Sequence, residues 1–459
     1  MLSLVQNINS ILWGPVLLIL LCGTGIIYTF KLRFIQVRKF AEGWRLMFSN
    51  FSLKGKKSDK GEMTPFQAIA TAIAGQVGTG NIAGAATALI SGGPGAVFWM
   101  WLSAFFGMST IYAEASLAQE FKEKGADGNV TGGPVYYIRQ AFKGTFGKVL
   151  AALFAVFCVL ALGFMGSMVQ TNSISVAFSD VAAARGFSFP PIIIGVILAA
   201  IGFFIFVGGT KRLSAVVEKI VPIMAVVYII GAVVLLLMNI STIPGVIKTI
   251  FVCAFSPESM LGGAAGITIQ QAIRYGVARG LFSNEAGMGS TPHAHARATA
   301  KNPHEQGLIA MVSVFIDTFI ILTLTAFAIL STDAISTGKT GTALAQQAFI
   351  TEFGGFGDIF IAVCLLFFAF STILSWHFFG AINMEYLFGK KSVKVYSCIV
   401  VIFMLVGSML KVDLVWELAD MFNGLMVIPN LLALLAMMRL VSSFGQKADE
   451  DKKRLDKSA

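Results

Sequence analysis

Two short segments rich in glycine and polar residues interrupt long apolar stretches of this sequence. The first, residues 75–84, reads GQVGTGNIAG, and the second, residues 279–289, reads RGLFSNEAGMG. Glycine costs a helix interior about 1 kcal/mol relative to alanine, so clustered glycines favour a break in the helix. At membrane depth, a break is tolerated only where it is buried in protein or lines a polar cavity. These segments are therefore the first candidates for a ligand site.

The composition indicates the class of protein that surrounds them. Of 459 residues, 56% are apolar and 13% are charged, and the mean hydropathy is +0.78. A soluble domain carries about 25% charged residues. The composition therefore excludes a soluble enzyme, a disordered chain and a secreted disulfide scaffold, and it predicts an all-α polytopic membrane protein. The five cysteines show no CxxC spacing, which argues against disulfides and a cysteine-ligated metal.

Apolar stretches of about 20 residues predict where the chain crosses the bilayer. The expected spans are 11–30, 64–91, 95–119, 148–179, 190–208, 215–239, 263–290, 308–331, 357–388, 394–410 and 418–441. With these eleven spans, 28 of the 34 Lys and Arg residues fall on one side of the membrane and four on the other. Because cytoplasmic loops are enriched in Lys and Arg, we expect an outside N-terminus and a cytoplasmic C-terminus in a bacterial plasma (inner) membrane.

The net charge of +10 is explained by the same pattern. Lys and Arg beside anionic headgroups indicate the lipid bilayer as the partner, not nucleic acid. Residues 37–51 mix basic and aromatic side chains at helical spacing, which predicts a helix on the inner surface. No obligate protein partner is implied.

The two broken spans occupy corresponding positions in the chain. Within a single transporter domain, 1–459, an extra N-terminal helix at 11–30 precedes two groups of five spans, 64–239 and 263–441, and a cytoplasmic polar tail follows at 442–459. Five spans per group would place the groups in opposite senses, and paired interrupted helices are typical of inverted-repeat secondary transporters. The alternative is that glycines such as Gly80 and Gly84 serve close helix packing.

A sixteen-residue block, residues 92–107 (GGPGAVFWMWLSAFFG), resembles the signature of the sodium:alanine symporter family, also called alanine or glycine:cation symporters. Residues 78–84, 280–287 and 371–376 add supporting matches. The resemblance implies the leucine-transporter-type fold of the APC superfamily, with two inverted five-helix repeats and one extra N-terminal helix. It also implies uptake of a small amino acid driven by sodium.

A zwitterionic amino acid needs donors for its carboxylate and acceptors for its ammonium group. Thr79 and Gly80, at the start of the second half of the first broken helix, can offer backbone N–H groups at a positive dipole end. Carbonyls freed around residues 280–283 could accept from the ammonium group. The resemblance implies that Gln76 and Asn172 add amide groups, although Asn172 could instead form an interhelical hydrogen bond.

Two aromatic residues, Phe282 and Trp376, are candidates for closing over the side chain of the substrate. Phe282 lies in the second glycine-rich segment, and Trp376 follows the Ser371-Thr372 pair by about one helical turn. A pocket with aromatic walls is small, which favours alanine, glycine or serine over leucine.

Sodium is the coupling ion that the resemblance implies, and hard cations prefer oxygen ligands. In the related fold, an ion site joins carbonyls at the first break to hydroxyls on the eighth core helix. This implies the carbonyls of Ala74 and Val77 and the hydroxyls of Ser371 and Thr372. The alternative is that both hydroxyls bond to carbonyls of their own helix.

Ionisable residues inside spans are functional by default, and we single out Glu114, Arg274, Arg279, Glu285 and Asp317. Arg279 and Glu285 could brace the second break or gate the inner pathway, and we expect Glu285 to pair internally. Asp317 keeps proton coupling open as an alternative.

Three histidines, His293, His295 and His304, follow the second broken span, and we expect them to be solvated because no Cys, Glu or Asp completes a metal site beside them.

The expected function is sodium-coupled symport of alanine or glycine by alternating access. The alternatives with this fold are another neutral amino acid, such as glutamine or serine, or coupling to protons. A channel is disfavoured because two unlike broken helices do not form a symmetric filter. An intramembrane enzyme or a nucleotide-driven pump is disfavoured because no catalytic residues and no GxxxxGK[ST] loop are recognisable.

Overall fold

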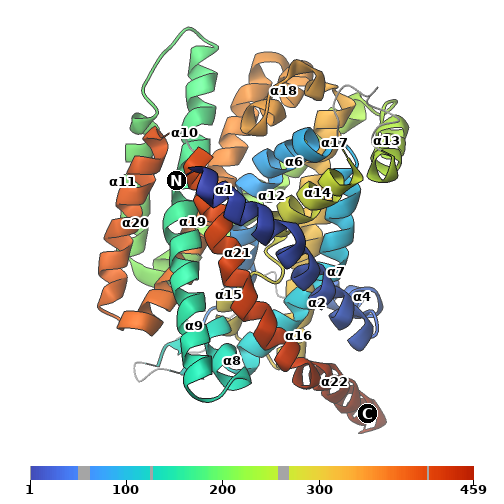
Figure 1. Ribbon diagram of the computed structural model, residues 1–459, viewed down its shortest axis with the longest axis vertical. Coiled ribbons are helices and arrows are strands. Elements are labelled where there is room, and N and C mark those ends of the chain that lie inside the picture. Colours follow the sequence, from blue (N-terminus) through green and yellow to red (C-terminus); the bar gives the residue numbers. More distant parts are fainter. Residues whose placement is uncertain (1, 50–61, 125–127, 257–267, 411–412, 459) are drawn as a thin grey trace.

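The computed structural model describes residues 2–49, 62–124, 128–256, 268–410 and 413–458. It consists almost entirely of helices, and several of the long ones run along the long axis of the molecule (Figure 1). In the first half of the chain the elements are α1 (Leu2–Ile11), η1 (Leu12–Val16), α2 (Leu17–Lys31), α3 (Ile35–Arg38), α4 (Phe40–Ser49), α5 (Pro65–Gln76), η2 (Gly80–Gly84), α6 (Ala85–Gly92), α7 (Ala96–Glu120), β1 (Glu123–Lys124), β2 (Val130–Thr131), α8 (Pro134–Ala141), α9 (Gly144–Cys158), η3 (Val159–Gly166), α10 (Ser167–Ala183), α11 (Ile192–Val207), α12 (Gly209–Met238) and α13 (Ile243–Phe255). In the second half they are α14 (Ile269–Asn284), α15 (Pro292–Arg297), α16 (Pro303–Val314), η5 (Phe315–Leu322), α17 (Thr323–Ser331), η6 (Ala334–Thr337), α18 (Gly341–Phe353), η7 (Gly354–Phe356), α19 (Gly357–Phe388), α20 (Ser392–Met409), α21 (Asp413–Ala436) and α22 (Met438–Ser458).

Eight described helical runs are long and apolar enough to cross a membrane. They are Leu2–Lys31, Ala96–Glu120, Gly144–Ala183, Gly209–Met238, Pro303–Ser331, Gly341–Phe388, Ser392–Met409 and Leu414–Ala436. Eight of the expected spans fall on these runs, and the span at 190–208 corresponds to the shorter helix α11. The two remaining expected spans, 64–91 and 263–290, are the two broken helices; residues 263–267 lie outside the described part of the chain.

The first broken helix is interrupted at residues 77–79. A capping box between Thr64 and Gln67 starts α5, which ends at Gln76. Val77 then takes an extended conformation, with φ −82° and ψ 91°, and the helix resumes through η2 into α6. The expectation of a broken helix at the first glycine-rich segment is confirmed.

The second break lies beyond the place where the sequence suggested it. Helix α14 continues through residues 280–283 to Asn284, so the expectation of unwound carbonyls at 280–283 was wrong. Gly280 instead permits close packing, since a Cβ there would lie 3.2 Å from Met100 Cα. The chain leaves the helix at Glu285, and Gly287 and Gly289 adopt φ values of +86° and +81°, which glycine reaches without strain.

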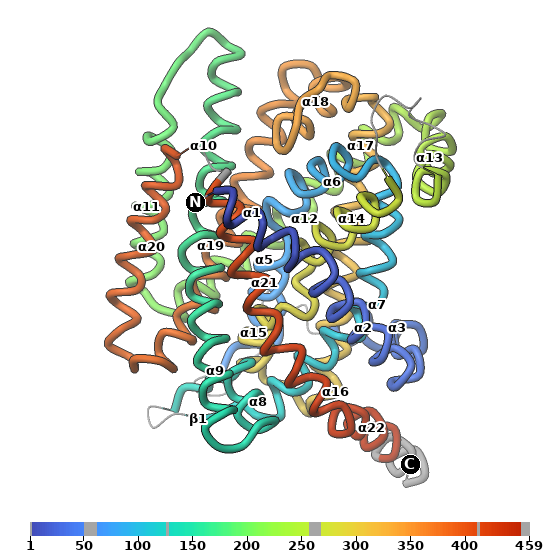
Figure 2. Tube along the Cα trace, in the orientation of Figure 1, coloured from blue at the N-terminus to red at the C-terminus, as the bar shows by residue number. Residues whose placement is uncertain are grey.

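Both breaks are buried among the long helices. Helix α7 packs against α14 and α16, and α19 packs against α5, α10 and α12. Figure 2 shows the chain crossing repeatedly between the end that carries α13 and α18 and the end that carries α8 and α22.

The longest described helices in regions read as loop, surface helix or tail are α4, α13, α18 and α22. α13 and α18 are 13 residues each, too short to be recognised as spans. α4 covers 40–49 of the expected surface helix, whose residues 50–51 are outside the described part. Residues 442–458 of the expected polar tail form most of α22.

Candidate functional site

An oxygen cluster joins the first break to α19. Thr372 Oγ1 lies 2.8 Å from the carbonyl oxygen of Ala74, 3.3 Å from that of Val77 and 3.0 Å from that of Phe368. Because α5 stops at Gln76, the N–H of residue 78 donates to the Asn81 side chain and not to Ala74. Three carbonyl oxygens thus compete for the single hydrogen of one hydroxyl.

Ser371 does not join this cluster. Its hydroxyl donates to the Phe368 carbonyl at 2.9 Å and lies 3.4 Å from the sulfur of Met224. Adjacent residues on a helix point about 100° apart, so only Thr372 reaches the first break. The structure therefore brings together three of the four residues expected around the ion and directs the Ser371 side chain elsewhere.

Unpaired polar atoms surround the first break. Gln76 is 2% exposed and Thr79 is fully buried. Within the described residues, Gln76 Oε1 and Thr79 Oγ1 have no hydrogen-bond partner. The Gln76 amide nitrogen donates to the Asn284 carbonyl at 2.9 Å, and Gly80 lies close to the other broken helix, since a Cβ there would be 3.2 Å from Ser283 Cα.

The amide that reaches this break from α10 is Gln170, which sequence reasoning missed. Gln170 Oε1 accepts from the Thr79 N–H at 3.3 Å. The Asn172 amide donates to the carbonyls of Gly407 and Leu410 at 2.9 and 3.0 Å, which is the interhelical alternative considered above. The signal was present, because both residues belong to one polar patch, but positions two apart face nearly opposite sides of a helix.

The two candidate aromatic residues lie together beside the second break. The rings of Phe282 and Trp376 are 6.4 Å apart in an edge-to-face arrangement, and Trp416 lies 5.9 Å from Phe282. Trp376 Nε1 donates to Glu285 at 2.6 Å, and the Ser290 hydroxyl donates to the other oxygen of the same carboxylate at 2.5 Å. Glu285 is therefore engaged inside the protein.

Asp317 connects the two broken helices. Its Oδ1 accepts from the Asn81 amide at 2.6 Å, and both of its oxygens accept from the Ser283 hydroxyl, at 3.1 and 3.0 Å. The Thr318 hydroxyl adds a bond at 2.9 Å. Asn81 belongs to the first broken helix and Ser283 to the second, so one fully buried carboxylate holds both.

Arg279 pairs with Asp420 of α21, at 3.1 and 3.3 Å, and not with Glu285. The pair lines a cavity of about 110 Å³ with Asn9 and Glu417. It thus lies near the N-terminal helix, and its role at a gate stays a prediction. Asp420 was missed, although an acid within an expected span was a usable signal.

Glu114 of α7 holds the second break from the opposite side. Its carboxylate accepts from the N–H groups of Gly287 and Gly289, both at 2.9 Å, and from the Asn430 amide at 2.6 Å. Helix α21, which carries Asn430, is thereby tied to the same turn.

A comparison with known protein families identifies the family of this chain. The model of the sodium:alanine symporter family matches residues 1–458. This chain belongs to that family. Its members are transporters and not enzymes, so the symporter is a multi-pass membrane protein of amino-acid and cation transport.

Known relatives extend over nearly the whole symporter. The sodium/alanine symporter AgcS of Methanococcus maripaludis is 39% identical over 462 residues, covering 100% of this chain and 99% of AgcS. A Bacillus subtilis protein named "Probable sodium/glutamine symporter GlnT" is 40% identical over 94% of this chain and 87% of its own length.

The fold matches that of solved transporters. The crystal structure of MhsT in complex with L-phenylalanine superposes with a TM-score of 0.58 at 16% identity, covering 81% of this chain and 89% of MhsT. The expected leucine-transporter-type fold, all-α with broken helices, is confirmed.

Proposed function

We propose that this symporter takes up a small neutral amino acid, alanine or glycine, driven by sodium. It would act in a bacterial inner membrane with its N-terminus outside and its C-terminus in the cytoplasm. The five-helix groups 64–239 and 263–441 would be the two inverted repeats, and alternating access would move them against each other. The name of AgcS supports alanine and sodium for this group of proteins.

The oxygen cluster at Thr372 carries the sodium assignment. Three carbonyl oxygens meet one hydroxyl hydrogen there, so a small cation would satisfy acceptors that the protein leaves short of donors. A singly charged ion needs no carboxylate at this position. The ligands would be the Ala74 and Val77 carbonyls and the Thr372 hydroxyl, with Ser371 outside the set.

The substrate would bind beside the same break. Gln76 Oε1 can accept from an ammonium group, and the Thr79 hydroxyl can donate to a carboxylate. Both atoms are buried and lack partners among the described residues, which normally costs free energy and is relieved by a polar ligand. Gly80 would place this site directly beside the other broken helix, because the absence of a Cβ lets Ser283 Cα approach.

The aromatic residues and the ion pair would control access. Phe282 and Trp376 are 5% and 2% exposed, so this conformation encloses the site. The Arg279 guanidinium lies 5.9 Å from the Phe282 ring centroid and 6.0 Å from that of Trp416. Opening the Arg279–Asp420 pair would expose these rings to the cavity on the side of the N-terminus.

Two alternatives have specific support. The name of GlnT favours a larger neutral substrate in at least one relative. The buried carboxylates of Asp317 and Glu285 could carry a coupling proton.

Uptake of radiolabelled alanine into proteoliposomes tests the proposal. An inward sodium gradient should drive accumulation, whereas equal potassium or proton gradients should not. Thr372→Val keeps the shape of the side chain and removes the oxygen, so the sodium concentration for half-maximal uptake should rise tenfold or more. Ser371→Ala is the matched control and should stay within twofold of the wild type.

Each other result would change one part of the proposal. Equal accumulation with a proton gradient would overturn sodium coupling, and unaltered sodium dependence in Thr372→Val would overturn the ion site. Glutamine uptake without alanine uptake would replace the substrate.

A further inference from the structure

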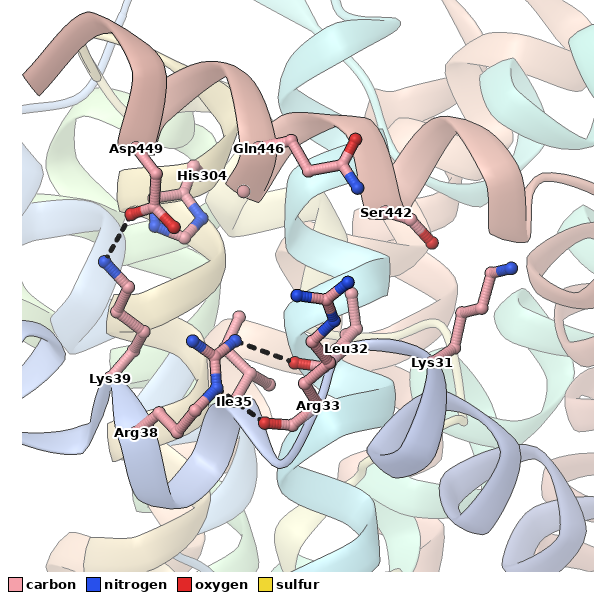
Figure 3. Close-up of a pocket in the computed structure, with 11 residues that line it drawn as sticks. Lys31, Leu32, Arg33, Ile35, Arg38, Lys39, His304, Ser442, Gln446 and Asp449 are labelled. Atoms are coloured by element: carbon pink, nitrogen blue, oxygen red, sulfur yellow. Dashed lines mark hydrogen bonds and ion pairs between the residues drawn. The ribbon is translucent and has the colours of Figure 1, made fainter. Parts of the chain in front are cut away.

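A basic pocket lies where α2 leaves its apolar run, between the α2–α3–α4 segment and the C-terminal helix α22. Its volume is about 100 Å³. Figure 3 shows Arg33 and Lys39 extending from the first segment towards Ser442, Gln446 and Asp449 of α22. This pocket is distinct from the broken helices.

The charge in the pocket is predominantly positive. Four basic residues, Lys31, Arg33, Arg38 and Lys39, face one acid, Asp449. Lys39 donates to Asp449 at 2.7 Å, which holds the pKa of that carboxyl below its ordinary value, and to Glu42 at 3.0 Å. These acids neutralise Lys39.

Three cations remain once Lys39 is neutralised. The Arg38 guanidinium donates to the backbone carbonyls of Leu32 and Arg33, at 3.1 and 2.6 Å. Within the described residues, the side chains of Lys31 and Arg33 take part in no hydrogen bond or ion pair. Two cations are thus available to a ligand.

His304 of α16 forms the inner wall of the pocket. Contrary to the expectation of a solvated histidine, it is only 3% exposed. Its Nδ1 lies 2.6 Å from the Tyr112 hydroxyl, whereas its Nε2 has no partner among the described residues. A buried nitrogen without a partner costs free energy, which a hydrogen-bond acceptor in the pocket would recover.

The backbone at the pocket is strained as well. Arg33 and Phe34 take φ values of +54° and +56°, which side chains other than glycine rarely adopt. Arg38 stabilises this bend through the two carbonyls named above. Strained backbone of this kind concentrates at ligand sites.

We propose that this pocket binds the phosphate headgroup of an anionic phospholipid and thereby links the α2–α3 bend to α22. Arg33 and Lys31 would bind the phosphate oxygens, and the headgroup would satisfy His304 Nε2. A lipid is favoured over free phosphate because Lys31 is the last residue of the membrane-spanning run Leu2–Lys31, the depth at which headgroups lie.

Binding to the detergent-purified full-length protein tests the proposal. Thermal-shift titrations would compare short-chain phosphatidylglycerol, phosphatidylcholine with the same chains, and inorganic phosphate. Only phosphatidylglycerol should raise the unfolding temperature in a saturable manner. Each basic residue near an anionic headgroup is worth about fivefold in affinity, so Lys31→Gln with Arg33→Gln should weaken binding about 25-fold.

The matched control removes two exposed lysines elsewhere, Lys391→Gln with Lys394→Gln, and should bind within twofold of the wild type. His304→Asn keeps a polar atom for Tyr112, removes the Nε2 group and should weaken binding. If the double pocket variant does not fold, Asp449→Asn provides the opposite test, because loss of the acid should tighten binding.

Equal stabilisation by inorganic phosphate would overturn the lipid assignment. Equal weakening in the pocket and control variants would overturn the site, and so would unchanged or weaker binding in Asp449→Asn. None of these measurements depends on the transported substrate, so they stand apart from the uptake assay.

Discussion

The first broken helix keeps side-chain polar atoms unpaired at its break, whereas residues 285–289 of the second leave no described side-chain polar atom unpaired. At the first break, Gln76 Oε1 and Thr79 Oγ1 have no partner among the described residues. At the second, the five consecutive amides from Glu285 to Gly289 all donate, to Leu281, Asn284, Glu285 and, twice, Glu114.

This difference indicates a division of labour between two otherwise similar interruptions. Unpaired buried groups are costly and persist where a ligand can satisfy them. A turn whose amides at residues 285–289 all have acceptors leaves no backbone donor there for a ligand, and these bonds instead fix the angle between α14 and α15. The first break would thus bind ion and substrate. The second would be a rigid turn that fixes the end of α14, where Phe282 lies.

Glu114→Gln should have the largest effect on the stability of the protein, because Glu114 accepts three of the hydrogen bonds that fix the second break. The amide has one acceptor oxygen, and its NH₂ group would face donors. Charged hydrogen bonds contribute about 1.5–3 kcal/mol each, so we expect a loss of about 2–4 kcal/mol in SDS-induced unfolding.

Glu120→Gln is the matched control, since Glu120 is an exposed acid on the same helix, and it should change stability by less than about 0.5 kcal/mol. Equal losses in both variants would mean that the second break is not braced by Glu114.

Asp317→Asn should have an intermediate effect and tests whether the two breaks act together. The amide oxygen can still accept from Asn81, and its NH₂ group can donate to Ser283, so the protein should fold. Loss of charge weakens both bonds by about 1 kcal/mol in total, which predicts roughly fivefold slower sodium-driven uptake.

Asp333→Asn changes an exposed acid in the same way and should leave uptake unaltered. If Asp317 carried a coupling proton, Asp317→Asn would abolish the pH dependence of uptake while leaving a slower, pH-independent rate. That result would favour the proton-coupled alternative.

The sequence predicted the features that depend on local composition. Glycine and polar residues within apolar stretches located both broken helices, and the first break was placed correctly. At the second, Gly280 was read as the point of unwinding, whereas the positive φ values fall at Gly287 and Gly289. A glycine that permits close packing and one that permits a left-handed turn look the same in a sequence.

Partners far apart in the chain could not be predicted. Glu114 is 173 positions from Gly287, and Arg279 is 141 positions from Asp420. No pattern in one sequence pairs them, because either acid could have met several bases or amides at the same depth. For a related reason the sequence could not show that Gln170, and not Asn172, reaches the first break, since the rotation of α10 is set by its neighbours.

Gly84→Ala should have the smallest effect, and of opposite sign. Gly84 has ordinary helical angles, and a Cβ there would have no atom within 4 Å. Alanine should therefore stabilise the protein by up to about 1 kcal/mol through helix propensity. At Gly80, a Cβ would press on Ser283 Cα, so Gly80→Ala should destabilise it. Equal destabilisation by both substitutions would favour the alternative that Gly80 and Gly84 form one helix-packing face. In that case the first break would no longer be the better candidate for ligand binding.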